Sequence, residues 1–320
     1  TQRVGLKPNE EEYILMGMAA YGEPIHEDAI RARFFEPSHT LRVRENPHLG
    51  IDDFLPDARH EDLAASIQKV TEGVLLDLFK IARSLARSDN AVFMGGLALN
   101  CVANSKIAET SAFEHLWIMP NPGDAGSSLG AAACLLGRQL AWEGPYLGSE
   151  IPGPYPVDAL LKELLTTGIA GVASGRAEFG PRALGARSLL ADPRSPEVKG
   201  KVNEIKRRQK FRPFAPVVVE EHAAEWFTMP YPRMPYMQFV STCKRPGEVP
   251  SICHYDNTSR VQTVTKDDHP GLRRLLDEWY GATGCPVLLN TSLNIRGEPL
   301  VNDVSQAQKF EQRYGVRVFS

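Results

Sequence analysis

Cysteine is scarce in this chain of 320 residues and shows no pairing pattern. The five cysteines are Cys101, Cys134, Cys243, Cys253 and Cys285, an odd number without any Cys-x-x-Cys spacing. Structural zinc sites use such spacings, and disulfide-stabilised secreted domains are much richer in cysteine. The sequence therefore indicates neither kind of site, and it favours a reducing compartment, the cytoplasm.

Long hydrophobic runs are also missing. No apolar stretch approaches the roughly 20 residues that cross a bilayer, and Thr1–Val4 does not resemble a secretory signal peptide. We therefore expect no membrane segment. The hydrophobic fraction of 42% and the charged fraction of 23% are ordinary for a globular protein. Two domains are expected at this length. A glycine- and proline-rich connector at 146–155 suggests domains at 1–150 and 151–320.

Positive charge is concentrated in one segment of a chain whose net charge is −3. Residues 176–212 contain eleven Lys and Arg against four Asp and Glu. Glycines and a Pro-Arg step punctuate the first half of this segment, so its backbone can approach a ligand closely. Such a site on a mildly acidic protein favours a small, highly charged anion, phosphate first. A solvated helix face explains Lys199, Lys201 and Lys210 equally well, and a nucleic-acid patch is the other alternative.

Two short apolar strands are expected in the first half, at 91–94 and 116–119. Each is followed by a glycine-rich turn and then by a helix, at 97–109 and from 124 to 140, and a long amphipathic helix at 61–88 precedes them. This order predicts a parallel α/β layer whose strand-to-helix turns open on the same edge.

The two turns carry the residues expected to meet a nucleotide. Glycines and the positive end of a helix dipole favour phosphate, while an aspartate can hold a divalent metal. Asp124 is the metal candidate, although simple capping of its helix is the stronger explanation for that residue taken alone. The nucleotide candidates are Gly95, Gly96, Asn100, Gly123, Gly126 and Ser127.

The second half is expected to be mixed α/β. Strands are expected at 168–174, 213–219, 237–241, 260–264 and 287–290, and helices at 196–208, 222–227 and 271–280. Hydroxyl and amide side chains follow the last strand, from Asn290 to Asn294. That position suits a bound phosphate or a small amide, although an ordinary polar turn is equally consistent.

Together these blocks resemble the O-carbamoyltransferase family that includes nodulation-factor and antibiotic carbamoyltransferases. The long block at 175–194, with its Gly-Pro-Arg-Ala-Leu-Gly core, is the most specific part of the likeness. The similarity covers most of the chain in the family's order. The matching segments are 16–22, 95–104, 123–131, 175–194, 205–216, 260–262 and 290–299.

This resemblance implies a partial actin/Hsp70-type (Kae1-like) ATP-binding lobe followed by a YrdC-like mixed α/β domain. In the YrdC-like domain, carbamoyl phosphate and ATP would give carbamoyl-adenylate. The Kae1-like domain would then transfer the carbamoyl group to an acceptor hydroxyl. Lys206, Arg212 and Asp124 match catalytic positions, with Asp124 as metal ligand. The matching residues for carbamoyl phosphate and ATP are Arg182, Lys206, Arg208, Arg212, Arg260, Ser292 and Asn294.

The resemblance also implies a divalent metal, Fe²⁺ or Mg²⁺, held in the family by an HxxxH pair in an upstream lobe. None of the eight histidines here forms that pair. We therefore expect the chain to be a fragment, or another chain to supply the amino-terminal lobe.

The acceptor is left open by the sequence. A sugar, a natural product and a hydroxymethylated base in DNA all offer an alcohol nucleophile. Two other functions are alternatives: a threonylcarbamoyl-AMP-type tRNA-modification enzyme, and a non-catalytic nucleic-acid-binding module. The module order and the block at 175–194 disfavour the first. The net charge and the few aromatics near the basic segment disfavour the second.

Overall fold

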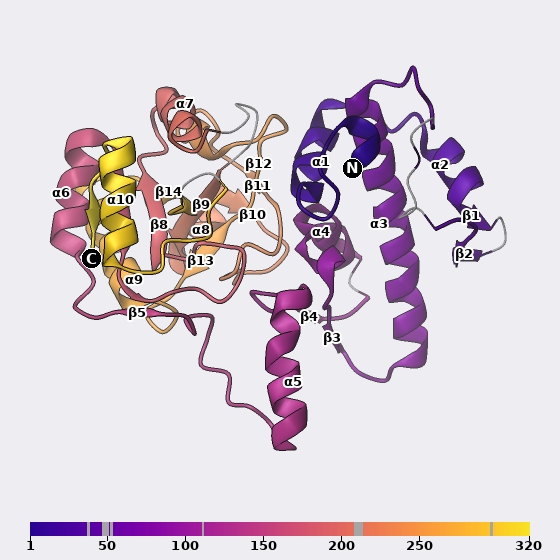
Figure 1. The fold of residues 1–320 in the computed structure, drawn as a ribbon, viewed down its shortest axis with the longest axis horizontal. Coiled ribbons are helices and arrows are strands. Elements are labelled where there is room, and N and C mark those ends of the chain that lie inside the picture. Colours follow the sequence, from indigo (N-terminus) through magenta and orange to yellow (C-terminus); the bar gives the residue numbers. More distant parts are fainter. Residues whose placement is uncertain (37–38, 47–50, 52–53, 111, 208–213, 295–296) are drawn as a thin grey trace. The chain divides into compact units, whose positions relative to one another are not determined.

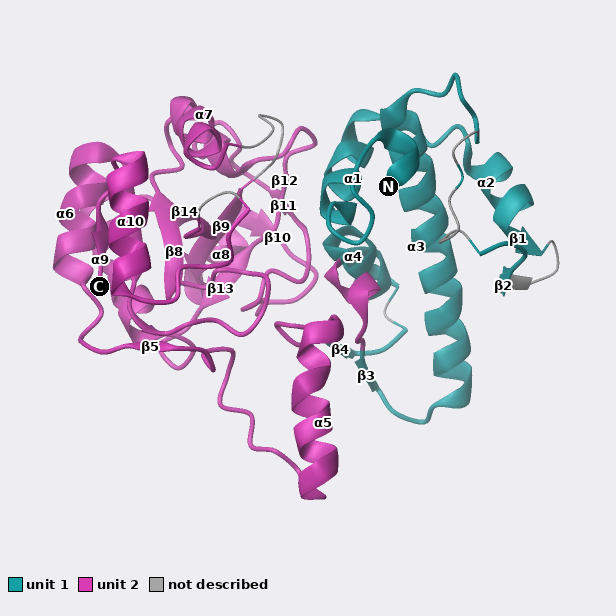
Figure 2. Cartoon of the chain, viewed as in Figure 1, with its two compact units in different colours: residues 1–92, 100–117 teal, residues 93–99, 118–320 magenta. Residues whose placement is uncertain are grey.

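The chain forms two compact units (Figure 2). The computed structural model describes residues 1–36, 39–46, 51, 54–110, 112–207, 214–294 and 297–320, and only the backbone of 39–41. Unit 1 comprises residues 1–92 and 100–117, and unit 2 comprises 93–99 and 118–320. Among the described helices, none is long and apolar enough to cross a membrane.

Unit 1 is organised around the long helix α3 (Figure 1). Its buried side chains include Leu63 and Val70, two turns apart, and Leu75 and Phe79, one turn apart, and the helices α1, α2 and α4 pack on it. The predicted helix at 61–88 is thereby confirmed, because α3 spans His60–Leu85. The other elements of unit 1 are η1 (Gln2–Val4), α1 (Glu12–Met18), η2 (Ala19–Tyr21), α2 (Glu27–Phe34), β1 (Phe35–Glu36), β2 (His39–Val43), β3 (Asn90–Val92), α4 (Cys101–Glu109) and β4 (His115–Trp117).

The two short strands of unit 1 pair as predicted. β3 and β4 run parallel, with Ala91 opposite Leu116. Both strands are shorter than the sequence suggested, and the helix expected at 97–109 is divided into η4 (Gly96–Leu99) and α4. The parallel layer is therefore confirmed, in a two-stranded form.

Unit 2 contains a six-stranded mixed sheet in the order β13-β9-β14-β8-β6-β15. This confirms the mixed α/β class. Its elements after η4 are η5 (Asp124–Gly126), α5 (Ser127–Leu136), β5 (Glu150–Ile151), α6 (Val157–Thr167), β6 (Ile169–Ala173), β7 (Gly175–Arg176), β8 (Arg187–Ala191), α7 (Pro196–Ile205), β9 (Ala215–Val219), α8 (Glu220–Trp226), β10 (Phe227–Thr228), β11 (Ser241–Cys243), η6 (Pro250–Ile252), β12 (Thr258–Ser259), β13 (Gln262–Val264), α9 (Pro270–Thr283), β14 (Val287–Ser292), α10 (Val304–Tyr314) and β15 (Val318–Phe319).

Helices α6 and α9 pack together against the sheet and form the main core of unit 2. α6 contributes Leu160 and Leu164, and α9 contributes Leu272 and Trp279, all of them buried. The indole of Trp279 donates to the carbonyl of Val287 at 3.1 Å, so its one polar atom is paired. This core fixes the sheet from which the site residues extend.

Unit 2 differs from the expected elements at three places. The strand expected at 237–241 is β11, which starts only at Ser241. The segment expected as a connector, 146–155, contains β5, which pairs with β7. The strand β8 lies inside the basic segment, where no strand was expected. All five of its residues are buried, and it pairs with β14 on one side and β6 on the other.

Candidate anion-binding site

Strand pairing gathers several predicted site residues at one edge of the unit 2 sheet. β14 runs antiparallel to both β9 and β8, with Ser292 opposite Ser188. β13 runs parallel to β9. The carboxyl end of β14 therefore lies at the same edge as the amino ends of β8, β9 and β13. Ser292 ends β14, Arg260 lies just before β13, and Arg182 lies in the loop before β8.

Lys206 is the centre of this candidate site. It follows α7, and only 8% of the residue is exposed. Its Nζ donates to the Ser292 carbonyl oxygen at 2.6 Å and to the Ser292 hydroxyl at 3.1 Å. It also donates to the Asn294 carbonyl oxygen at 3.3 Å and to the Asn294 side-chain oxygen. The structure thus brings together three residues that the sequence assigned to one site.

The partners of Lys206 are themselves fixed. The Ser292 hydroxyl donates to Asn294 Oδ1 at 2.7 Å, and Asn294 Nδ2 donates to the Glu298 carbonyl at 3.0 Å. These oxygen atoms are neutral, so they satisfy the ammonium hydrogen bonds without cancelling its charge. A buried cation held in this way attracts an anion strongly, because water screens it poorly.

Arg260 adds a second cation near this edge. Its Nε is buried and has no hydrogen-bond partner among the described residues. An unpaired guanidinium N–H in a buried position is costly unless a ligand accepts from it. Arg182 is partly exposed on its loop. The predicted Arg208 and Arg212 lie outside the described residues.

The block at 175–194 contains two buried charged residues whose structural role the sequence reading missed. Glu178 Oε1 accepts the backbone N–H of Leu184, Ala186 and Arg187 at 2.7 to 3.2 Å. Burial raises the pKa of Glu178, although these hydrogen bonds act in the opposite direction. The Arg187 guanidinium donates to backbone carbonyls, including that of Ser149 at 2.9 Å. Both residues shape the Arg182 loop from inside.

The far side of that loop is held by buried amides. Asn290 Nδ2 donates to the Ala183 carbonyl at 3.0 Å, and Gln262 Nε2 donates to the Leu184 carbonyl at 3.0 Å. Gly185 has a φ of +119°, and a Cβ there would lie 2.6 Å from a methyl group of Leu272. Only glycine fits this position without strain. The loop that carries Arg182 is therefore fixed on both sides.

The glycine-rich turns after β3 and β4 are joined. Gly95 N–H donates to the Pro122 carbonyl at 2.7 Å, which agrees with the expectation that both turns open on one edge. Gly95 and Gly96 are exposed. Gly126 is a packing glycine, because a Cβ there would overlap the Asn121 carbonyl oxygen.

The polar nucleotide candidates have local partners. Asn100 Oδ1 accepts the Ala103 N–H at 3.0 Å and caps α4, and Asn100 Nδ2 donates to Gln68 at 2.9 Å. The Ser127 hydroxyl donates to the Asp124 carbonyl at 2.6 Å. Sequence alone could not reveal these partners, since capping and ligand binding use the same residue types.

Asp124 was the predicted metal ligand. It is the first residue of η5, directly after Gly123, and it is exposed. Over the described part of the chain, no group of three or more His, Cys, Asp or Glu side chains could hold a metal ion. The described residues therefore do not by themselves fit the Fe²⁺ or Mg²⁺ that the family resemblance implies, because one carboxylate positions such an ion poorly.

Comparison with known proteins gives the same family for both halves. Residues 1–134 match the family model described as carbamoyltransferase N-terminus, and residues 161–319 match carbamoyltransferase C-terminus. Nodulation protein NolO of Bradyrhizobium diazoefficiens is 33% identical over 339 residues, covering 93% of this chain and 62% of the relative. Nodulation protein U of Sinorhizobium fredii is 37% identical over 256 residues, covering 74% and 46%.

A third relative extends the same pattern. Nodulation protein U of Rhizobium tropici is 32% identical over 330 residues, covering 95% of this chain and 57% of the relative. The chain thus spans between 46% and 62% of the length of these three relatives. The two family models follow one another along the sequence and together account for most of it. The chain belongs to the carbamoyltransferase family.

Proposed function

We propose that this chain carries the activating centre of an ATP-dependent O-carbamoyltransferase, in a YrdC-like domain within unit 2. The observation that supports the proposal most strongly is the buried Lys206 ammonium, held by Ser292 and Asn294 beside the edge where Arg260 lies. Family membership supplies the transferred group, a carbamoyl group.

In the proposed reaction, carbamoyl phosphate and ATP give carbamoyl-adenylate. Water first displaces phosphate from carbamoyl phosphate and leaves carbamate. A carbamate oxygen then attacks the α-phosphorus of ATP, and pyrophosphate leaves as the bond between the α- and β-phosphates breaks. Negative charge develops on phosphoryl oxygens as the α-phosphorus is attacked. Lys206, Arg182 and Arg260 would stabilise that charge as cations fixed before the reaction starts. Arg208 and Arg212 are further proposed contacts from the sequence.

We propose that the first part of the chain serves the transfer step, as part of a Kae1-like module. The exposed backbone at Gly95 and Gly96, with Gly123 and the amino end of α5, would bind the nucleotide portion of the adenylate. The carbamoyl carbon would then be attacked by an acceptor hydroxyl. Sugars, natural products and hydroxymethylated DNA bases are the acceptor classes to test.

The surface of α5 supports completion of this module by a further lobe. None of its ten residues is buried, although most are apolar, and Leu135 is 88% exposed. Exposed apolar surface of this kind marks an interface. We propose that the additional lobe, from the same or another chain, covers α5 and supplies the remaining metal ligands around Asp124.

Exchange of labelled pyrophosphate into ATP tests the activation step. The exchange should depend on carbamoyl phosphate and should be lost in Arg212→Ala, for which Arg83→Ala on the exposed end of α3 is a control. Exchange that proceeds equally well without carbamoyl phosphate would contradict the proposed reaction. Unchanged exchange in Arg212→Ala would remove Arg212 from the site while leaving the reaction standing.

A further inference from the structure

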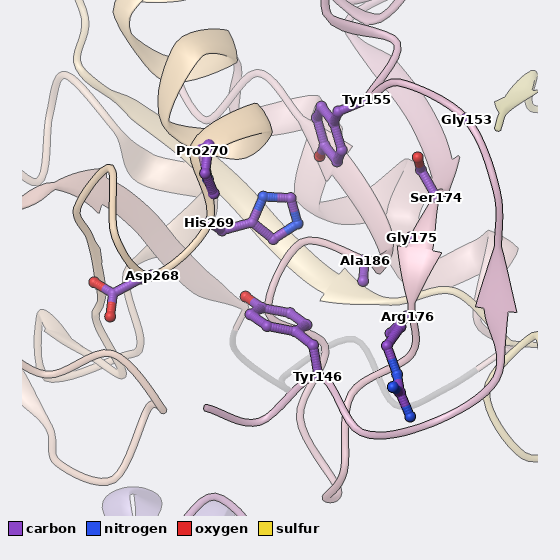
Figure 3. A pocket seen from close by; sticks show the side chains of 10 residues that line it. All are labelled: Tyr146, Gly153, Tyr155, Ser174, Gly175, Arg176, Ala186, Asp268, His269 and Pro270. Atoms are coloured by element: carbon purple, nitrogen blue, oxygen red, sulfur yellow. The ribbon is translucent and has the colours of Figure 1, made fainter. Parts of the chain in front are cut away.

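A cavity of about 240 Å³ lies in unit 2, beside the amino end of α9 (Figure 3). Its lining includes Tyr146, Tyr155, Ser174, Arg176 and His269. None of these residues belongs to the proposed activating centre. Drug-sized ligands occupy pockets of roughly 300–1,000 Å³. A ligand of this cavity is therefore small.

His269 gives the cavity an unused hydrogen-bond donor. Its Nδ1 accepts the Leu272 N–H at 3.0 Å and caps α9. Burial lowers the pKa of His269 to about 4, so the ring is neutral at physiological pH. A neutral imidazole that accepts at Nδ1 carries its proton on Nε2. No described residue accepts from Nε2, so this N–H is available to a ligand acceptor.

The aromatic rings make two walls of the cavity. The imidazole of His269 lies between Tyr146 and Tyr155, with centroid distances of 5.1 and 4.9 Å (Figure 3). Both phenol hydroxyls point away into the protein, donating to the carbonyls of Leu184 and Gly185 at 3.0 Å. The tyrosines therefore offer ring surface, which suits a flat apolar group.

The remaining polar groups of the lining favour an anion. The Ser174 hydroxyl has no hydrogen-bond partner among the described residues, and it can donate. Arg176 stands at the rim, and among the described residues its guanidinium donates to two neutral backbone carbonyls, at 2.9 and 3.3 Å, and to no carboxylate. The one carboxylate of the lining, Asp268, is already paired with Arg233 at 2.5 Å. Of the lining residues, Arg176 therefore has a positive charge that no described carboxylate pairs with.

We propose that this cavity is a binding site for a small, flat organic carboxylate. The carboxylate accepts from His269 Nε2 and the Ser174 hydroxyl and lies near Arg176. The flat body of the ligand packs against the ring surface that Tyr146 and Tyr155 present to the cavity. A carboxylate has two acceptor oxygens, which matches the two neutral donors, and its negative charge is complementary to Arg176.

The site adjoins the loop that carries Arg182. A Cβ on Gly185 would lie 3.4 Å from His269 Cδ2, and the Tyr155 hydroxyl holds the Gly185 carbonyl. A ligand in the cavity therefore contacts groups that pack directly on this loop. Binding should shift the backbone amide resonance of Gly185 while leaving that of Gly281, at the other end of α9, unchanged.

The test is calorimetric titration of the full chain with benzoate, benzyl alcohol and benzylamine, which share one ring and differ in charge. Benzoate should bind saturably and at least tenfold more tightly than benzyl alcohol, and benzylamine should not bind. His269→Asn keeps an oxygen that can cap α9 but removes the ring and its Nε2–H. It should weaken benzoate binding tenfold or more.

His222→Asn is the matched control, because that imidazole also lies against a tyrosine ring, Tyr280 at 4.5 Å, away from the cavity. It should bind benzoate like the unchanged chain. Arg176→Gln should abolish the preference for benzoate over benzyl alcohol. Equal binding of the three probes, benzoate affinity unaffected by His269→Asn in a folded variant, or tighter binding of phenyl phosphate than of benzoate would overturn the proposal.

Discussion

Lys206 Nζ lies 2.6 Å from the carbonyl oxygen of Ser292, a residue 86 positions further along the chain. The contact connects the end of α7 to the end of β14, across the edge where the cations of the site gather. A lysine this buried contributes a charge that water screens poorly. Its effect on bound phosphate should therefore exceed that of a surface lysine.

Replacing this lysine by the similarly sized Met should abolish activation. We expect Lys206→Met to reduce carbamoyl-phosphate-dependent pyrophosphate exchange at least a hundredfold, or about 2.7 kcal/mol of transition-state stabilisation. Lys199→Met is the control within the preceding helix α7, where Lys199 Nζ donates to the Cys253 carbonyl at 3.0 Å. Exchange within threefold of the unchanged chain in Lys206→Met would place the site elsewhere.

Arg182→Lys should be damaging although it conserves charge. A planar guanidinium can bind two phosphoryl oxygens at once, and an ammonium acts as a point charge. We expect the KM for carbamoyl phosphate to rise at least tenfold, about 1.4 kcal/mol. A rise below threefold would show that Arg182 has a structural role only. The thermal unfolding midpoint of the variant distinguishes the two roles: loss of ligand binding leaves the midpoint unchanged, and loss of a structural contact lowers it.

The sequence pattern indicated part of this site. Ser292 and Asn294 follow an apolar strand, and Lys206 lies in a basic segment, which suited a phosphate site, while the family resemblance implied that the three belong to one site. The contacts among the three bear out that they lie together. What each binds in a ligand complex is still a prediction.

The roles of two charged residues in the block at 175–194 could not be interpreted from the sequence. The two terminal nitrogens of the Arg187 guanidinium donate to the chain's own carbonyls, and Glu178 accepts from three backbone N–H groups. A sequence does not show whether the partner of a buried charge is a ligand or the backbone. For the same reason the sequence could not show that the Asn100 side chain caps α4. Its contact with a nucleotide stays a prediction.

Glu178→Ala should destabilise unit 2 strongly. The substitution leaves the N–H groups of Leu184, Ala186 and Arg187 without their acceptor in a buried loop. We expect the free energy of unfolding to fall by about 2–4 kcal/mol, as is typical of lost buried polar partners. Glu178→Gln keeps an acceptor oxygen and should retain most of the unfolding free energy that Glu178→Ala loses.

Urea denaturation checks this prediction, followed by tryptophan fluorescence, because Trp226 and Trp279 are buried in unit 2. Glu248→Ala on the exposed surface should change the unfolding free energy by less than about 0.5 kcal/mol. An equally small effect of Glu178→Ala would mean that water replaces the carboxylate without cost.

His269 should make the protein sensitive to acid. Burial lowers its pKa from 6.5 to about 4, so the unfolded chain binds a proton more readily than the folded chain. Its contribution to stability is therefore present above pH 6.5 and is lost as the pH falls from 6.5 towards 4. His269→Asn lacks this group and should lose less stability over that range. If the urea unfolding midpoints of the unchanged chain and of His269→Asn change with pH in the same way, the acid sensitivity does not come from His269.

The proposed activation and transfer steps should be separable in this chain. Lys206, Ser292 and Asn294 all lie in unit 2, so we expect the proposed pyrophosphate exchange to need no further part. Transfer to an acceptor needs more than the described residues offer: Asp124 stands without a cluster of metal-binding side chains, and the apolar surface of α5 is uncovered. We expect this chain, given carbamoyl phosphate, ATP, Mg²⁺ or Fe²⁺ and a panel of hydroxyl acceptors, to catalyse exchange without forming carbamoylated product. Mass spectrometry of the acceptors measures the second step directly. Product formed at a rate equal to exchange would show that α5 and Asp124 need no additional lobe, and it would contradict the two-step separation.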